Sequence, residues 1–132
     1  MRTKLAVAAA GLGLLLASVP AIAHHSFAAE FDAAKPIKLT GSVTKVEWMN
    51  PHTYFYIDVK DEKGAVTNWG LEMGSPNGLM RQGWTRNSMK IGDVVTVEGS
   101  AAKDGSNIGN ARSVTLAGGQ RLFAGSSQQT NP

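Results

Sequence analysis

Residues 54–60 alternate between two kinds of side chain, and no other feature restricts the fold of this chain as strongly. Successive side chains of a β-strand point to opposite faces, so the alternation predicts a strand with one apolar and one mixed face. The apolar side chains are Phe55, Ile57 and Val59, and those on the other face are Tyr54, Tyr56 and Asp58. The corner Asn50-Pro51-His52 precedes this strand, so a histidine stands at its beginning. The strand therefore carries both core residues and a candidate surface site.

Four more segments share this strand-like character, and a short segment between the third and fourth strands has the pattern of a helix. The first strand changes the parity of its apolar residues near Thr44-Lys45, which predicts a β-bulge or a sharp bend. Ser75-Pro76 is a typical helix start, and Gly83 would end that helix. The expected strands are 37–48, 54–60, 66–73, 94–99 and 112–116, followed by a hairpin arm at 121–123, and the expected helix is 77–82.

This order of elements is typical of a small five-stranded OB-like barrel, an all-β fold with one short helix between strands three and four. The residues expected in its core are Val43, Phe55, Ile57, Trp69, Leu71, Val95 and Val97. Barrels of this kind bind ligands on the face of strands two and three. Here that face would present Tyr54, Tyr56, Asp58, Asn68 and Glu72. A generic small β-barrel or β-sandwich is the competing architecture.

Residues 1–23 have the composition of a secretory signal peptide. Arg2 and Lys4 form a basic start, residues 5–19 are apolar, and Ala21-Ile22-Ala23 is a small-x-small cleavage site. A membrane anchor is the weaker interpretation, because the apolar run is shorter than a bilayer span and Pro20 interrupts it. We therefore expect a periplasmic protein without a stable membrane anchor after cleavage. Its parts would be an N-terminal arm at 24–36, the barrel at 37–124 and a disordered tail at 125–132.

Charge and cysteine content exclude several classes of function. The whole chain has 13 basic and 10 acidic residues. Loss of Arg2 and Lys4 with the signal peptide leaves 11 basic residues against the same 10 acidic ones, so the mature net charge is +1. Because an exported chain without a basic run rarely meets DNA, we expect no nucleic-acid partner. The absence of cysteine excludes disulfides, thiolate metal ligands, thiol nucleophiles and a lipoprotein anchor.

Four short motifs are similar to those of a known family. They are His24-His25-Ser26-Phe27, Glu47-Trp48-Met49-Asn50-Pro51-His52, Glu72-Met73-Gly74-Ser75-Pro76 and Gly83-Trp84-Thr85-Arg86. Over nearly all of its mature length the chain resembles a family of small exported bacterial proteins catalogued as a domain of unknown function. The resemblance implies export and a compact β domain, and it lends no established activity and no catalytic residues.

The three histidines fall at two places, the expected mature N-terminus and the corner before the second strand. Cleavage after Ala23 would give His24 a free α-amine beside its imidazole, and His52 would add a third nitrogen to a set that suits Cu(II). His25 is an alternative partner of the amine, and cleavage two residues earlier would leave Ile22-Ala23-His24, which also binds copper. The other interpretation is that the terminal histidines are only solvated and that His52 hydrogen-bonds its own corner.

Additional ligands stand in the same motifs. Glu47 or Glu72 would supply an oxygen, and Met49 or Met73 a thioether. No spacing singles out an acid–base pair, a nucleophile elbow or a phosphate-binding loop. The sequence thus predicts a non-enzymatic binding or accessory protein that coordinates copper. A second hypothesis is an OB-type module that binds a partner protein or a small ligand through its aromatic face, without metal. A copper-dependent oxidase is the third, although no broad substrate surface is recognisable.

Overall fold

The computed structural model of the protein describes residues 26–125. The expected signal peptide, His24, His25 and residues 126–132 lie outside the described residues, whereas Gly125, the first residue of the expected tail, is buried. The elements in chain order are α2 (Ser26–Glu30), β1 (Phe31–Glu47), β2 (Tyr54–Lys60), β3 (Val66–Glu72), α3 (Pro76–Arg81), β4 (Val94–Ala102), β5 (Ile108–Thr115) and β6 (Arg121–Phe123). Within residues 26–125, neither helix is long and apolar enough to cross a membrane.

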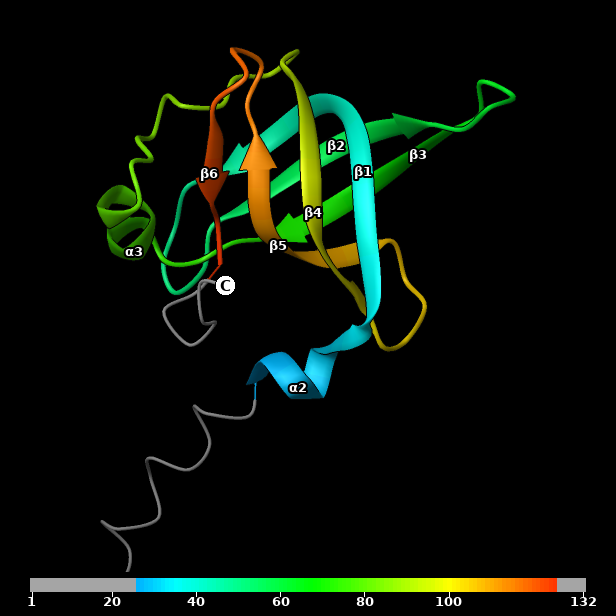
Figure 1. The fold of residues 1–132 in the computed structure, drawn as a ribbon, viewed down its shortest axis with the longest axis horizontal. Helices are drawn as coiled ribbons and strands as arrows, with labels where there is room; N and C mark the ends of the chain where they lie inside the picture. Colours follow the sequence, from blue (N-terminus) through cyan, green and yellow to red (C-terminus); the bar gives the residue numbers. More distant parts are fainter. Residues whose placement is uncertain (1–25, 126–132) are drawn as a thin grey trace, which may run out of the picture.

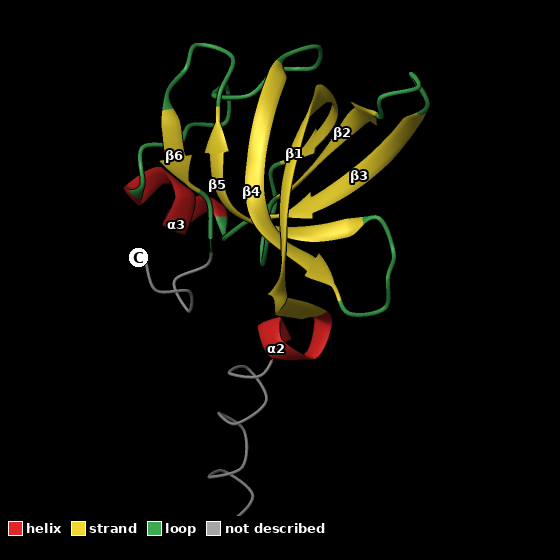
Figure 2. Ribbon diagram, turned by 45° about the vertical axis from the view of Figure 1, so that its right-hand side comes forward, coloured by secondary structure: helices red, strands yellow, loops and turns green. Residues whose placement is uncertain are grey.

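The strands form one sheet that closes on itself. Its order is β3-β2-β1-β4-β5-β6, and a parallel pairing between β3 and β5 joins the two sides into a ring of five strands (Figure 1). The helix α3 follows β3 in the chain and precedes β4, while β6 extends the sheet beyond β5. This is the strand order of an OB-like barrel, so the predicted fold is confirmed. Figure 2 shows α2 at one end of the barrel and α3 beside β6.

The long strand β1 bends so that it can pair with both of its neighbours. Its earlier part pairs with β4 and its last part with β2, and Ser42 belongs to both pairings. The register with β2 shifts between Val43 and Lys45, so the predicted bulge is present. At Gly41 the strands lie so close that an added Cβ atom would be 2.3 Å from the Asp58 carbonyl oxygen. Glycine is therefore required at the bend.

The start of β1 lies earlier than the sequence predicts. Phe31 and Asp32 pair with the end of β4, and the register then shifts before pairing resumes at Pro36. Proline has no N–H group to donate, so a regular ladder cannot continue through this position. The expected N-terminal arm therefore contains the short helix α2 and the first part of β1.

The core lies inside the barrel and has the expected register of β2. Phe55 and Ile57 are fully buried, and so are most of the other residues that the sequence places inside. Those others are Val43, Leu71, Val95 and Val97. Trp69 packs against this core but is only partly buried. The reason is that β2 and β3 project beyond the barrel as a hairpin, in which residues 66–68 are exposed (Figure 1).

The helix α3 begins and ends with the expected signals. The Ser75 hydroxyl accepts a hydrogen bond from the Gly78 N–H group (3.2 Å), and Pro76 stands in the first turn. The chain turns away at Gly83, whose φ of +99° is a left-handed conformation that glycine adopts without strain. Trp84 Nε1 then donates to the Phe123 carbonyl oxygen (2.9 Å), and this bond ties the loop to β6.

Candidate functional site

His52 is fixed in the corner before β2 by the backbone of the residue that follows it. The Thr53 N–H group donates to the Gly74 carbonyl (3.0 Å), and the Met73 N–H group donates to the Thr53 carbonyl (2.8 Å). These bonds continue the β2–β3 ladder beyond the ends of both strands, and Thr53 is completely buried. His52 is therefore held beside the end of β3.

The imidazole of His52 has one nitrogen engaged and one available. Nδ1 lies 3.1 Å from the Met73 carbonyl oxygen and 3.4 Å from Oε1 of Glu72. A carbonyl oxygen can only accept a hydrogen bond, so Nδ1 carries a proton and Nε2 of the neutral ring keeps its lone pair. Within residues 26–125 Nε2 has no hydrogen-bond partner, and 32% of the side chain is exposed. Metal-binding histidines commonly have this arrangement, in which the other ring nitrogen donates to a carbonyl or carboxylate.

Glu72 connects His52 to Tyr54. Its side chain is buried, with Oε1 facing His52 and Oε2 accepting a hydrogen bond from the Tyr54 hydroxyl (2.8 Å). Tyr54 and Glu72 are direct cross-strand partners, which explains this contact. Burial raises the pKa of Tyr54 above its ordinary value, and the hydrogen bond to Glu72 and the charges of Glu72 and Glu30 add to the shift. Tyr54 therefore remains a donor to the Glu72 carboxylate at neutral pH.

The last residue of helix α2, Glu30, lies within electrostatic range of Tyr54. The Glu30 carbonyl accepts a hydrogen bond from the Lys103 N–H group (2.9 Å), which ties the helix to the end of β4. The ring centroids of Phe27 and Phe31 are 5.6 Å apart, so the helix also packs on the beginning of β1.

Two of the three expected metal ligands, His24 and His25, lie outside the described residues, directly before the first residue of α2. In the described part of the chain, no three histidine, aspartate or glutamate side chains form a group that could hold a metal ion. The described structure thus provides one candidate nitrogen ligand, on His52, together with the two groups that orient it.

The expected ligand face is assembled from cross-strand pairs of β2 and β3. The pairs are Tyr54–Glu72, Tyr56–Gly70 and Asp58–Asn68. The ring of Tyr56 covers Gly70, where an added Cβ atom would lie 3.1 Å from it, and Lys45 Nζ is 5.4 Å from the ring centroid. At the hairpin end, Asn68 Nδ2 donates to Asp58 Oδ1 (2.9 Å). The five predicted side chains are therefore neighbours, and most of their polar groups are paired with one another.

Apart from Glu72, the additional metal ligands proposed from the sequence do not lie at His52. The sequence also did not predict the Met73 carbonyl as the hydrogen-bond partner of its ring. Met73 is buried in the core, so its thioether is unavailable and only its carbonyl reaches the histidine. Glu47 forms an ion pair with Lys45, and Met49 is exposed in the loop before the corner. A backbone carbonyl leaves no residue-specific signal in a sequence, which is why a search for side-chain patterns does not find this partner.

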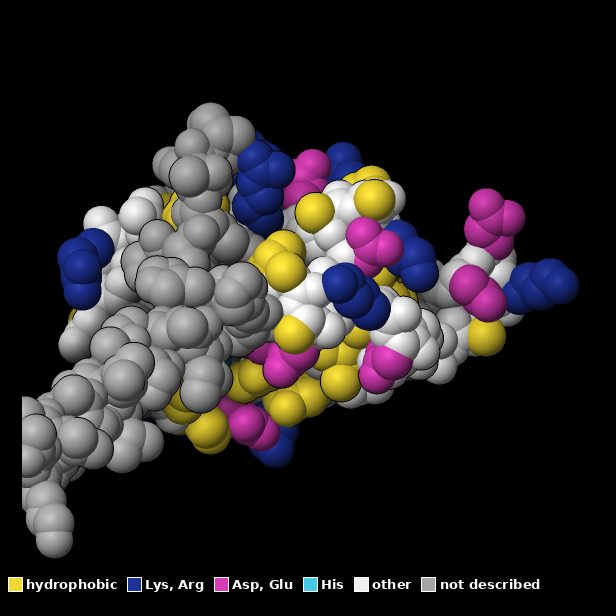
Figure 3. Space-filling view, turned by 90° about the horizontal axis from the view of Figure 1, so that it is seen from below, with side chains coloured by type: hydrophobic (Ala, Val, Ile, Leu, Met, Phe, Trp, Pro, Cys, Tyr) yellow, Lys and Arg dark blue, Asp and Glu magenta, His cyan; other side chains and the backbone are white. Residues whose placement is uncertain are grey.

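Figure 3 shows the molecule from the side of α2. On the described part of this surface, several hydrophobic side chains adjoin one another, and acidic and basic side chains lie around them.

Comparison with known proteins gives one structural likeness and one family. A mitochondrial single-stranded DNA binding protein from S. cerevisiae, solved as a crystal structure, matches with 12% identity and a TM-score of 0.49 over 62% of this chain and 92% of that chain. The fold assignment rests on the strand order and not on this likeness. No curated protein matches the chain. The match to a family model over residues 10–112 shows that the chain belongs to a family of unknown function, DUF6152.

Proposed function

We propose that this protein is an exported, periplasmic accessory protein that binds copper through Nε2 of His52 and through nitrogen donors at the mature N-terminus, where His24 supplies the α-amine and either its own imidazole or that of His25 completes the set. The observation that carries the proposal is the pair of acceptors at Nδ1 of His52, the Met73 carbonyl and the Glu72 carboxylate. They fix the tautomer and the ring orientation that a metal ligand needs before the metal arrives.

The N-terminal donors are supported by the sequence and by the place of α2. If the signal peptide is removed after Ala23, His24 contributes an amine and an imidazole, and only His25 separates it from Ser26, the first residue of α2. The opposite end of that short helix, at Glu30, is within electrostatic range of Tyr54 in the corner. A set of nitrogen donors without thiolates favours Cu(II) among the common metals.

The experiment compares copper binding by His52→Ala with that of the protein purified from the periplasm. Intact mass first establishes whether the chain begins at His24. We expect His52→Ala to weaken Cu(II) binding and to change its EPR spectrum, because one nitrogen ligand is lost. If affinity and spectrum are both unchanged, the N-terminus binds copper alone and the proposed site is wrong.

A second comparison tests the groups that orient His52. Glu72→Gln keeps the size of the side chain but removes the charge that faces Nδ1, and loss of such a partner commonly weakens metal binding about 10–100-fold. Glu98→Gln makes the same change on β4, away from the corner, and is the matched control. Equal copper affinities of the two variants would contradict a role for Glu72.

The second candidate function is an OB-type module that binds a partner protein or small ligand without metal. It is favoured by Tyr56, whose ring lies over Gly70 beside Lys45 and is only partly buried. Such a ring could stack on a ligand. This function becomes the better account if His52→Ala leaves copper binding unchanged.

A further inference from the structure

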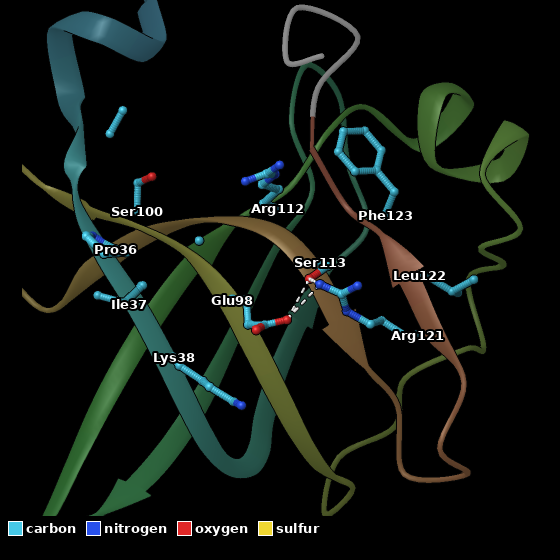
Figure 4. Close-up of a pocket in the computed structure, with 12 residues that line it drawn as sticks. Pro36, Ile37, Lys38, Glu98, Ser100, Arg112, Ser113, Arg121, Leu122 and Phe123 are labelled. Atoms are coloured by element: carbon cyan, nitrogen blue, oxygen red, sulfur yellow. Dashed lines mark hydrogen bonds and ion pairs between the residues drawn. The ribbon is translucent and has the colours of Figure 1, made fainter. Parts of the chain in front are cut away.

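A pocket of about 690 Å³ lies on β1, β4, β5 and β6. Its volume is within the range of ligand-binding pockets, about 300–1,000 Å³. It shares no lining residue with the His52 corner or with the aromatic face. Figure 4 shows three basic side chains in it, Lys38, Arg112 and Arg121, and one acidic side chain, Glu98. We refer to it as the basic pocket.

The register of four adjacent strands places the polar groups of the basic pocket in one row. Lys38 on β1 lies opposite Glu98 on β4, and Glu98 lies opposite Ser113 on β5. Ser113 in turn lies opposite Phe123 on β6. Direct cross-strand partners share a face of the sheet, so residues far apart in the sequence meet across the pocket.

An irregularity in β5 adds Arg112 to this row. Glu98 pairs with Ser113, but the next residue of β4, Gly99, pairs with Ala111, so Arg112 has no direct partner on β4. Consecutive side chains of a regular strand point to opposite faces, and a β-bulge interrupts this alternation and redirects a side chain. Arg112 and Ser113 accordingly both line the pocket (Figure 4).

One of the three cations is already oriented by its neighbours. Nη2 of Arg121 donates to Oε2 of Glu98 (2.9 Å) and to the Ser113 hydroxyl oxygen (3.1 Å). The Ser113 hydroxyl donates to the same Glu98 oxygen (3.2 Å). The hydrogen bond from Arg121 holds the pKa of Glu98 below its usual value, with smaller contributions in the same direction from Ser113 and Lys38. Glu98 is therefore ionised at neutral pH.

The pocket has more positive charge than its own carboxylate can neutralise. Within residues 26–125, neither Lys38 nor Arg112 forms an ion pair, and the single carboxylate of the lining, Glu98, faces three cations. The Arg121 guanidinium has five N–H donors, and the bonds to Glu98 and Ser113 use only one of its nitrogens. Ile37 and Phe123 add apolar surface to the lining.

We propose that the basic pocket binds a small organic anion with two oxyanion groups, either carboxylate or phosphate. Arg112 and Lys38 contact the two anionic groups, and Arg121, held by Glu98 and Ser113, supplies further donors. The apolar part of the ligand packs on Phe123. This site is independent of the copper site, because the two share no residue.

The experiment is calorimetric titration of the metal-free mature protein with glutarate, which carries two carboxylates, and, separately, with fructose 1,6-bisphosphate, which carries two phosphates. We expect saturable binding of at least one, and the one bound more tightly identifies the preferred oxyanion. Arg112→Ala and Lys38→Ala should each weaken it by about tenfold, the loss of one charge-assisted hydrogen bond. Glu98→Gln should tighten it, because a competing carboxylate is removed.

Arg86→Ala is the matched control, because it removes one exposed charge from the loop between α3 and β4. Binding to this variant should be unchanged, and thermal unfolding should show that all variants remain folded. The proposal is overturned if neither ligand binds saturably in the millimolar range. It is also overturned if Arg112→Ala and Arg86→Ala weaken binding equally, since the effect would then come from net charge alone.

Discussion

The His52 corner and the basic pocket satisfy their polar groups in opposite ways. At the corner, Glu72 is buried and each of its oxygens faces a protein partner. In the basic pocket, Glu98 and Arg121 form their ion pair at the surface, with 41% and 64% of their side chains exposed. The carboxylate of the corner is enclosed and paired, whereas the basic pocket is open and has surplus positive charge.

The difference shows what each region can recognise. Buried polar groups are costly to separate, because water does not replace a lost partner, so the corner holds one ring in one orientation. Exposed charges lose little when they separate, so the pocket selects by charge and can adapt to the shape of a ligand. Binding of a metal ion requires a ligand ring held in one orientation, whereas binding of an organic anion tolerates charged side chains that can adjust.

The largest expected effect is a difference in stability between two variants, one lacking the carboxylate of the corner and the other lacking the carboxylate of the basic pocket. Glu72→Ala leaves the Tyr54 hydroxyl and His52 Nδ1 without a carboxylate partner, and we expect it to lower the free energy of unfolding by about 2–3 kcal/mol. Glu98→Ala should lower it by about 0.5 kcal/mol or less, as is usual for an exposed ion pair. Urea unfolding of both variants measures the contrast. Similar losses would mean that the corner is no better packed than the surface.

Thr53→Val is expected to stabilise the protein. Among buried side chains of the described residues, the Thr53 hydroxyl is the one with no hydrogen-bond partner, and valine has nearly the same shape. Removing this group should raise the free energy of unfolding by about 1–2 kcal/mol. The control is Thr96→Val, which removes a hydroxyl that is bonded to Thr40 (2.9 Å) and should bring no gain. A destabilised Thr53→Val protein would show that its hydroxyl has a partner in solution.

Tyr54→Phe separates the hydrogen bond to Glu72 from the packing of the ring. We expect a loss of about 1 kcal/mol in the free energy of unfolding, because a buried carboxylate loses a donor. Tyr56→Phe removes a hydroxyl with no hydrogen bond within residues 26–125 and should be nearly neutral. Chemical denaturation of this matched pair tests whether Tyr54 supports the corner. Equal stabilities of the two variants would remove Tyr54 from the description of the site.

The smallest expected effect is a pH dependence in the basic pocket. The folded state lowers the pKa of Glu98, chiefly through the hydrogen bond from Arg121. The stabilisation is therefore present above the ordinary glutamate pKa, near 4.3, and is lost as pH falls below it. The difference in stability between the wild type and Glu98→Gln should be about 0.5 kcal/mol or less at pH 7 and should shrink as the pH falls below the ordinary glutamate pKa. A difference that grows in acid would have the wrong sign.

Much of the fold is predictable because local pattern and tertiary structure agree. The alternation in β2, the parity change near Thr44, and the Ser75-Pro76 helix start each depend on neighbours within a few residues, and the structure has all three. Trp69 and the start of β1 were predicted less well, because their environment depends on where the hairpin projects and where β4 ends.

The sequence by itself determined the types of side chain on each strand, the order of the strands and the concentration of histidines at two places. It also brought Tyr54 and Glu72 into the expected face, because strand alternation is a local rule. Only the tertiary structure decided that the Met73 carbonyl directs His52, and that the register of β1, β4 and β5 unites Lys38, Glu98 and Arg112 in one pocket. These contacts depend on cross-strand register and on a bulge, which arise from pairing between distant segments and leave no spacing in the sequence.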